Sequence, residues 1–540
     1  MRIRINGRDA RSTIRAQDGG KLISKHELQN HEWNLPADGR TPAGPPPSAM
    51  GAPMVAAGNR RLWLGLLLVM VGLTLTRLFL AGRTELIPEE AYYWTYAQHP
   101  ALGYFDHPPL VAWAVRAGTL VFGDTELGVR FVNFLAWIAT CFLLLATGKA
   151  WFSERVALAG TLLFAILPIS VGIGFLVTPD AVLILFWTLT LFAVSRAVQT
   201  QCGRYWVLAG LAFGGALLAK YYALVLLPSL LIFLAVSPRY RFWLKKPQPW
   251  LAGLLALAVF SPVIIWNAQH DWASFAFQST RTIGQSGAVV RRVGTFWLYQ
   301  LLMPTPVGLA VLAVAAGRAV RLGWWGDRAD NWNFVAAFGL PVFGLFAAAS
   351  FKTNIHINWT APAFLALALG GGAVWVEALE ARRRGWVTGT WVLLVLCGAA
   401  AIFGHVRLAT GHPAKVAYAN DNGWRELAVQ VRAAAPATGG QPFFIGMDKY
   451  NIAAELGFYL QQPAECVNSY ATGAQGLGYR YWTDLRRYVG RPAVIVFAGK
   501  LPVGLGKYFS RLSDPVRLRV DAHGREWKAV VGFDYRASLD

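Results

Sequence analysis

Runs of apolar residues separated by short polar segments occupy most of the chain between residues 62 and 408. The hydrocarbon core of a bilayer is spanned by about 20 apolar residues of helix. The pair of runs on either side of Lys220 is the least regular, because this charge interrupts the apolar sequence. Eleven runs predict transmembrane helices: 62–81, 128–147, 156–176, 180–196, 205–219, 221–236, 249–266, 294–316, 333–350, 358–377 and 388–408.

A shorter apolar run, 110–123, follows a long polar loop at 82–127. Its length predicts a helix that lies in the membrane interface and does not cross the bilayer. Residues 1–61 are polar and basic and contain a stretch rich in Pro, Gly and Ala, which predicts a disordered basic tail. The membrane domain therefore extends over residues 62–408.

Residues 409–540 contain no apolar run of bilayer length and predict a small soluble α/β domain. GWRELAVQVRAAA (423–435) and KYNIAAELGFYL (449–460) have the periodicity of helices. PFFIGMD (442–448) and AVIVFAG (493–499) have the composition of buried strands. A helix between two such strands is typical of an α/β arrangement.

The positions of Lys and Arg predict the orientation of the helices, because cytoplasmic loops carry an excess of both. With the N-terminus in the cytoplasm, every inner loop is basic, whereas the outer loop 82–127 is mainly acidic. An odd number of helices then places residues 409–540 outside the membrane. The outer loop 267–293 fits less well because it contains Arg281, Arg291 and Arg292.

Composition agrees with a membrane protein. Hydrophobic residues make up 55% of the chain and charged residues 15%, whereas a soluble domain has about 25% charged residues. In a soluble protein the net charge of +21 would indicate nucleic acid as a partner. Here the basic residues lie in loops on one side, so membrane lipids are the expected partner and nucleic acid is not. The four cysteines form no disulfide framework or zinc spacing.

The stretch IPEEAYYWTYAQHPALGYFDHPPL (87–110) is the most unusual polar segment. Pro88 favours a helix start, and helical spacing then puts Glu89 on one face with Tyr92, Tyr93 and Tyr96. Two interpretations remain open for these residues. Acids in a first turn complement the helix dipole, and Tyr is common at membrane interfaces; alternatively, the same face binds a ligand.

The second half of this segment, GYFDHPPL, favours the ligand. Pro108 restricts His107 to an extended backbone, so Asp106 and His107 are presented from a rigid turn. An acid, an imidazole and aromatic rings beside a bilayer suit a polar headgroup carried on a lipid.

The pattern PEEAYYW…GYFDHPPLVAW resembles the first external loop of the GT-C membrane glycosyltransferases. It is most similar to the bacterial family-39-like group, which includes the galacturonosyltransferases of lipopolysaccharide core and lipid A. It is more distantly similar to lipid A aminoarabinose transferases and protein O-mannosyltransferases. The resemblance covers residues 62–410, and FKTNIHINWTAPAF (351–364) and DKYNIAAELGFYL (448–460) share it.

The resemblance implies an α-helical polytopic membrane protein of the GT-C type, with about eleven transmembrane helices and a small C-terminal periplasmic α/β domain. It implies transfer of a sugar from an undecaprenyl-phosphate-linked donor to a lipid or glycan acceptor, with lipopolysaccharide or lipid A as candidates. It places the chain in the bacterial inner membrane, with the N-terminus cytoplasmic and the reaction at the periplasmic face.

The resemblance also assigns roles to two acids. Glu89 stands where the family has its catalytic acid, usually Asp, and Glu90 matches the Glu that follows it. Asp180 matches a second acid at the start of a later helix; a helix N-cap after Pro179 is the alternative. Glu89 is expected to take a proton from a hydroxyl acceptor, and Asp180 to orient the acceptor.

Attack on the anomeric carbon expels a lipid phosphate, which a cation or a metal ion must stabilise. No cofactor is implied beyond a divalent ion, for which Glu89 and Asp180 are the candidate ligands.

His107 stands where aminoarabinose transferases carry a Lys at the donor phosphate. Lys220 marks either a tight outer turn or a phosphate contact, and Arg281 is either a phosphate contact or a residue near anionic headgroups. The candidate substrate-binding residues are Glu90, Tyr92, Tyr93, Asp106, His107, Lys220, Arg281, Lys352 and His356.

Two other functions compete with transfer. A transporter or flippase would be expected to show charges near mid-membrane and internal repeats, whereas most charges here lie at helix ends and no repeat is evident. A glycan polymerase or ligase would be expected to carry a large external loop rich in Arg and His, and the loop 267–293 is only moderate in size.

Overall fold

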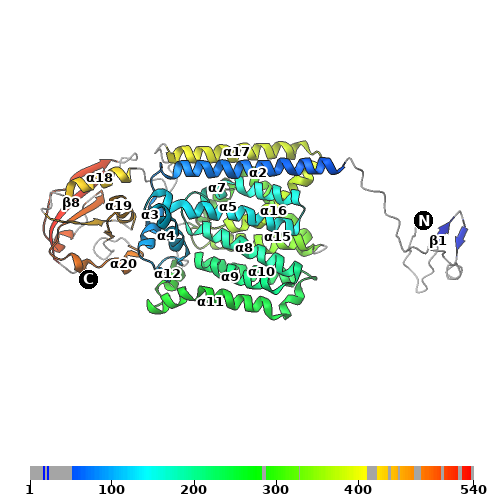
Figure 1. The fold of residues 1–540 in the computed structure, drawn as a ribbon, viewed down its shortest axis with the longest axis horizontal. Coiled ribbons are helices and arrows are strands. Elements are labelled where there is room, and N and C mark those ends of the chain that lie inside the picture. The colour runs from blue at the N-terminus through cyan, green and yellow to red at the C-terminus, as the bar shows by residue number, and fades with distance from the viewer. Residues whose placement is uncertain are drawn as a thin grey trace. The chain divides into compact units, whose positions relative to one another are not determined.

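The structure is a computed structural model, and it falls into two compact units, residues 1–57 and 58–540. The first unit contains a short antiparallel hairpin of β1 (Ala16–Asp18) and β2 (Lys21–Ile23) (Figure 1). The rest of the predicted disordered tail, up to residue 50, lies outside the described residues. The structure describes residues 16–18, 21–23, 51–281, 288–326, 329–409, 423–435, 440–447, 450–466, 476–499, 501, 504–520 and 526–536.

The larger unit contains a bundle of apolar helices (Figure 1). Within the described residues, seven helices are long and apolar enough to cross a membrane: 59–81, 126–151, 179–200, 247–269, 306–325, 330–349 and 361–380. The elements of the bundle are α2 (Gly51–Ala81), α5 (Glu126–Trp151), α6 (Glu154–Ile166), α7 (Pro168–Ile173), α8 (Pro179–Thr200), α9 (Gly203–Ala219), η1 (Tyr221–Val225), α10 (Leu226–Val236), η2 (Arg241–Lys245), α11 (Pro247–Gln269), α13 (Val289–Leu302), α14 (Pro306–Arg318), η3 (Ala319–Trp325), α15 (Asp330–Ala349), α16 (Ala361–Glu380) and α17 (Arg384–Ala409).

The count of eleven membrane helices is not confirmed, because several predicted spans are short or interrupted. The span 156–176 breaks at Leu167, whose backbone is extended before Pro168 as expected for a residue that precedes proline. The span 294–316 breaks at Thr305, which has φ 63° and precedes Pro306. Helices α9 and α10 are separate and shorter than a bilayer.

Close helix packing in the bundle depends on small residues, as is common in membranes. Helix α16 packs against α6, and a Cβ added to Gly372 would lie 2.5 Å from the backbone nitrogen of Gly160. Any side chain at Gly372 would therefore force the two helices apart.

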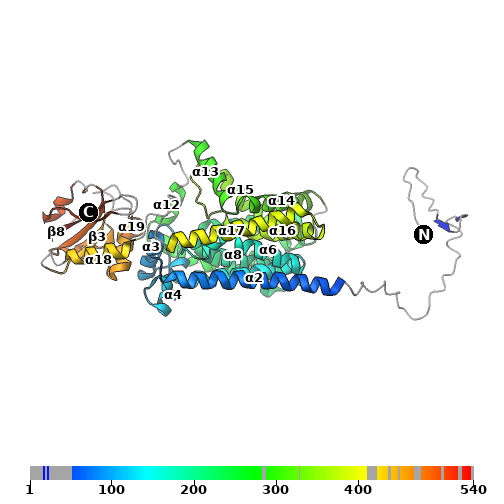
Figure 2. The same ribbon diagram turned by 90° about the horizontal axis from the view of Figure 1, so that it is seen from above.

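Helices α3 (Pro88–Gln98), α4 (Leu110–Phe122) and α12 (Ala273–Arg281) lie at one end of the bundle, next to the C-terminal domain (Figure 1). The helix predicted over 110–123 is therefore present as α4. Helix α19 (Asn451–Leu460) of the C-terminal domain packs on α3, and Figure 2 shows the same neighbours from above.

The C-terminal domain is built on a mixed sheet of β3 (Phe443–Gly446), β4 (Ala464–Cys466), β5 (Ala493–Ala498), β6 (Phe509–Leu512), β7 (Val516–Val520) and β8 (Glu526–Tyr535). The strand order is β4-β3-β5-β8-β6, and β7 also pairs with β8. Strands β4, β3 and β5 are parallel, whereas β8 is antiparallel to its neighbours.

Four elements of this domain were predicted and are present: the helices α18 (Trp424–Ala434) and α19 and the strands β3 and β5. The sequence analysis missed β4, β6, β7 and β8. The domain also contains α20 (Tyr479–Trp482), η5 (Leu485–Tyr488) and η6 (Leu505–Tyr508). The expectation of a small α/β domain is confirmed.

The C-terminal domain is attached to the first polar loop by a helix cap. The Glu85 carboxylate accepts hydrogen bonds from the backbone nitrogens of Gly423, Trp424 and Arg425, at 2.5, 2.9 and 3.2 Å. These amides begin α18 and would otherwise have no partner inside the helix. The Tyr459 hydroxyl accepts a second bond from Leu86 N, at 2.8 Å.

Replacing Glu85 by Ala is expected to loosen this attachment. Loss of the cap and of its favourable interaction with the helix dipole costs about 0.5–2 kcal/mol. Hydrogen exchange of the first amides of α18 should accelerate in Glu85→Ala and stay at the wild-type rate in Glu380→Ala, which removes an exposed carboxylate. Equal exchange in both variants would contradict the cap.

Candidate active site

Helix α3 starts at Pro88 and places its tyrosines as the spacing predicts. The Glu90 carboxylate turns back to accept a hydrogen bond from Ile87 N, at 3.1 Å, which closes the first turn. The side chains of Tyr92 and Tyr93 are buried, at 2% and 6% exposure.

Glu90 is held by a fully buried ion pair with Arg130 of α5. Its Oε1 lies 2.9 Å from the Arg130 Nε, and its Oε2 lies 2.5 Å from the Arg130 Nη2. Oε1 also accepts a bond from Val177 N, at 3.0 Å. Glu90 is 0% exposed and both oxygens are engaged, so its position suits a structural role better than the substrate contact that we expected.

The remaining donors of Arg130 bind the chain just before α3. Its Nη1 donates to the Thr84 carbonyl at 2.9 Å and to the Thr84 hydroxyl at 2.8 Å, and Nη2 donates to the Glu85 carbonyl at 2.9 Å. Val177, the other partner of Glu90, lies just before α8. The pair therefore connects the segment that carries Glu89 to the segment that carries Asp180. Arg130 was not predicted as a site residue. Its position could have indicated a role, because it is an arginine at the start of the apolar run 128–147, directly after the acidic outer loop.

Asp180 lies in the first turn of α8 and is 0% exposed. Both of its oxygens contact Lys220 Nζ, at 2.9 and 2.8 Å. Asn358 Nδ2 donates to Oδ2 at 2.5 Å, and the Tyr222 hydroxyl lies 3.4 Å from Oδ1. Lys220 ends α9 and also pairs with Asp180, so it occupies a turn between two short helices and carries a buried charge. Asn358 was missed, although it lies within the quoted stretch 351–364.

Asp106 lies among the tyrosines of α3. Its Oδ1 accepts bonds from the hydroxyls of Tyr92, at 3.0 Å, and Tyr96. The His107 ring lies close by, with Nε2 3.9 Å from Oδ2. Burial raises the pKa values of Tyr92 and Tyr96 well above the usual range, and the Asp106 charge raises them further. Both phenols therefore stay protonated and donate to the carboxylate.

Tyr93 lies one helical turn after Glu89, on the same face of α3. Burial raises the pKa of its hydroxyl well above the usual range, and the charges of Asp106, Glu89 and Asp180 raise it further. Its ring also lies edge-on to His107, with centroids 5.8 Å apart. Glu89 itself is partly exposed.

The other predicted residues belong to two further segments: Lys352 and His356 lie in the turn after α15, and Arg281 belongs to α12. Lys352 is exposed in the turn after α15 and forms no ion pair in the described part of the chain. His356 packs against Trp359, with ring centroids 5.1 Å apart. Arg281 ends α12, and its side chain lies outside the described atoms. Within the described residues, no three His, Cys, Asp or Glu side chains are grouped as a metal site.

Comparison with known proteins gives three similarities. A family model described as dolichyl-phosphate-mannose-protein mannosyltransferase matches residues 106–266. The lipid A galacturonosyltransferase RgtD of Rhizobium johnstonii is 26% identical over 77% of this chain and 86% of that protein. The crystal structure of ArnT from Cupriavidus metallidurans in the apo state has a TM-score of 0.62 at 15% identity, covering 86% of this chain and 98% of that one.

The chain therefore resembles the GT-C membrane glycosyltransferases in sequence and in fold.

Two further relatives extend the comparison. The undecaprenyl phosphate-α-4-amino-4-deoxy-L-arabinose arabinosyl transferase of Pseudomonas aeruginosa is 27% identical over 60% of this chain. The match spans 61% of that relative's length. ArnT from Cupriavidus metallidurans bound to undecaprenyl phosphate has a TM-score of 0.60 with this chain at 15% identity. The fold expected from the sequence is therefore confirmed.

Removing the Arg130 side chain is expected to destabilise the protein strongly. Arg130→Ala leaves the Glu90 charge buried without a partner, which costs about 3–5 kcal/mol. Arg130→Lys should recover only part of this loss, because an ammonium cannot reproduce the fork of donors. Arg155→Ala, which breaks an exposed pair with Glu380, should cost less than about 1 kcal/mol. Thermal unfolding in detergent compares the three; equal midpoints would contradict the anchoring role.

A double-mutant cycle separates structure from chemistry at Asp180. Asp180→Asn and Lys220→Met each leave one buried charge unpaired and should each cost about 3–5 kcal/mol. The double variant removes both charges, so its loss should be smaller than the sum by about 0.5–3 kcal/mol. Additive losses would contradict the pairing. If the double variant regains stability without activity, the charges themselves are needed for transfer.

Proposed function

We propose that the transferase moves a sugar from an undecaprenyl-phosphate-linked donor to a lipid acceptor of the lipid A class, at the external face of the bacterial inner membrane. The observation that carries this proposal is the buried ion pair of Asp180 with Lys220, in which Lys220 Nζ lies 2.9 and 2.8 Å from the two Asp180 oxygens. The names of RgtD, with its lipid A acceptor, and of the Pseudomonas aeruginosa enzyme, with its undecaprenyl-phosphate donor, support it.

The distribution of basic residues supports the proposed orientation. Three ion pairs connect the ends of α5, α14 and α16 with the start of α6. They are Lys149–Glu154, Arg155–Glu380 and Arg318–Glu377. These helix ends are rich in Lys and Arg, as cytoplasmic loops are. Helix α3 precedes the start of α5, so its carboxylates fall at the opposite end. We therefore place the N-terminus in the cytoplasm and the C-terminal domain in the periplasm.

In the proposed reaction, an acceptor hydroxyl oxygen bonds to the anomeric carbon of the sugar. The bond between that carbon and the phosphate oxygen breaks, and its electron pair leaves with the lipid phosphate. Glu89 is partly exposed beside Tyr93 and takes the hydroxyl proton as the bond forms. If the acceptor is already an ionised phosphate, Glu89 only positions it.

The negative charge that develops on the leaving phosphate needs a nearby cation. Lys220 is held in place by both oxygens of Asp180. Lys352 is exposed and available for a phosphate on the membrane surface. We assign Lys220 and Lys352 to the leaving phosphate and Asp180 to the orientation of Lys220. His107, next to Asp106, is assigned to the sugar, and Arg281 and His356 stay candidates for the phosphate.

Glu89→Gln is expected to reduce transfer by about 10²–10⁴-fold, since the amide cannot accept the proton. The measurement is mass spectrometry of lipids and glycans from cells that express the wild type, a deletion or Glu89→Gln at equal levels. A sugar mass that disappears from the same lipid in both mutants identifies the acceptor directly.

Asp484→Asn is the matched control, because it neutralises an exposed carboxylate of the C-terminal domain. It should keep the wild-type glycan profile. A wild-type profile in Glu89→Gln would show that Glu89 is structural. An unchanged profile in the deletion would overturn transfer itself and favour the transporter.

A further inference from the structure

A cavity of about 510 Å³ lies between the first polar loop, the end of α11 and helix α20 of the C-terminal domain. A volume of this size is within the usual range for small-molecule sites, about 300–1,000 Å³. The cavity is lined by Gln98, His99, Pro100, Ala101, Leu102, Gly103, Tyr104, Phe105, Trp266, Gln269, His270, Gly478, Tyr481 and Trp482. Among the described residues, this lining contains no Asp, Glu, Lys or Arg.

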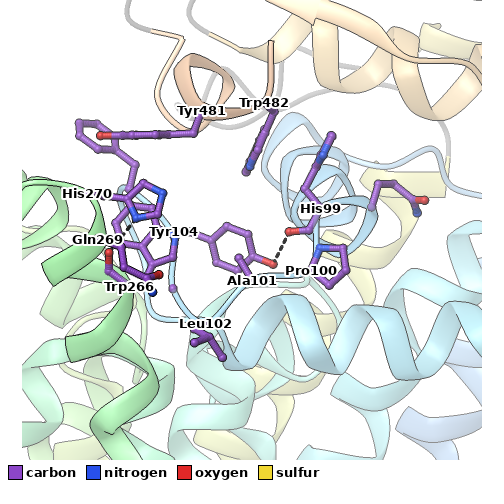
Figure 3. A pocket seen from close by; sticks show the side chains of 14 residues that line it. His99, Pro100, Ala101, Leu102, Tyr104, Trp266, Gln269, His270, Tyr481 and Trp482 are labelled. Atoms are coloured by element: carbon purple, nitrogen blue, oxygen red, sulfur yellow. Dashed lines mark hydrogen bonds between the residues drawn. The ribbon is translucent and has the colours of Figure 1, made fainter. Parts of the chain in front are cut away.

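Flat aromatic surfaces dominate the walls. Trp266 and His270 are stacked, with centroids 4.1 Å apart and planes within 10°. Trp482 and His99 form a second stack, with centroids 5.0 Å apart and planes within 3°. Figure 3 shows the two stacks on opposite sides of the cavity, with Tyr104 between them.

Two features fix these rings in place. Tyr104 is 2% exposed, and its ring stacks on Tyr96 with centroids 4.1 Å apart. A Cβ added to Gly103 would lie 3.0 Å from the Trp266 side chain, so the glycine permits the loop to approach the tryptophan. The cavity walls are therefore held by packing before any ligand binds.

The polar groups are few and directional. The His270 Nδ1 lies 2.7 Å from the Trp266 carbonyl oxygen, which can only accept a hydrogen bond. Nδ1 must therefore carry the proton, and the neutral ring presents Nε2 as an acceptor. Gln269 adds an amide at the same end of α11. Aromatic rings can pack against the apolar face of a sugar, and a few separate donors and acceptors can bind its hydroxyls. This combination suits a saccharide.

We propose that this cavity binds the saccharide part of the acceptor. The proposal rests on the proposed function and adds the place where the acceptor is recognised. The lining that the structure describes contains no Lys or Arg, whereas the leaving phosphate of the donor needs a cation, so the lining fits a sugar better than the donor headgroup. The exposed Arg480 lies at the edge, 5.7 Å above the Phe105 ring, where it suits an anionic group on the acceptor.

The cavity also lies beside the loop that carries Asp106. Tyr104 and Phe105 line it, and Asp106 follows them directly in the chain. Gln278 of α12 donates to the Asp106 carbonyl oxygen at 2.7 Å, which holds this part of the loop. An acceptor sugar in the cavity would therefore lie on the same loop as Asp106, whose carboxylate binds Tyr92 and Tyr96.

The test is steady-state kinetics of the purified full-length transferase with lipid A and an undecaprenyl-phosphate-linked sugar. Trp482→Ala should raise KM for lipid A by about tenfold or more, with a much smaller change in KM for the donor. Trp391→Ala is the matched control, because Trp391 is 63% exposed on α17 and lines no part of the cavity. Trp482→Phe keeps a ring and should fall between wild type and Trp482→Ala. If Trp482→Ala does not fold, Trp482→Phe and His99→Ala carry the comparison.

A direct binding measurement separates this proposal from the proposed function. Saturation-transfer NMR with the deacylated glucosamine disaccharide of lipid A should detect binding to wild type and to Trp391→Ala, and loss of binding in Trp482→Ala. That pattern supports the cavity even if the wild type transfers no sugar to lipid A. An increase confined to KM for the donor, or equal binding in all variants, would overturn the proposal.

Discussion

The buried ion pair between Glu90 and Arg130 is the interaction on which the candidate site depends. Moving two charges out of water is costly, and only saturated hydrogen bonding makes such a pair tolerable. Here the requirement is met by the Thr84 and Glu85 carbonyls and by the amides of Ile87 and Val177. The partners of the pair are backbone groups from separate segments, so satisfying the charges fixes the positions of those segments.

This constraint also holds the segments that carry the two proposed catalytic acids. Glu89 precedes Glu90 on α3, and Asp180 lies three positions after Val177. Neither acid takes part in the buried pair, but each lies within three residues of a group that the pair holds in position. Asp180 is fully buried and receives its counter-charge from Lys220. Glu89 is the more exposed of the two, as its proposed contact with an acceptor requires.

The sequence predicts the local part of this arrangement and not the long-range part. Helical spacing alone puts Glu89, Tyr92 and Tyr93 on one face, because those positions depend on a single helix. The meeting of Asp180 with Lys220 depends on how α8 packs against α9, which no periodicity encodes. Arg130 and Asn358 were overlooked for the same reason. The count of membrane helices failed at Leu167 and Thr305, where extended or positive-φ backbone interrupts an apolar run that hydropathy treats as continuous.

The site and the proposed acceptor cavity divide the chemistry between two parts of the fold. Charged groups at the ends of apolar helices suit a phosphate that arrives within the membrane, because low dielectric strengthens their attraction. Rings from α20 suit a sugar that arrives from outside. The two are joined through the Glu85 cap and through consecutive residues of one loop, Tyr104 to Asp106. No residue of α20 takes part in the buried ion pairs of Glu90 or Asp180, but Trp482 of α20 packs against Tyr92 and Tyr96, which bind Asp106. A change in α20 would therefore alter the proposed acceptor cavity and the surroundings of Asp106 together, while the pair of Asp180 and Lys220 stays unchanged.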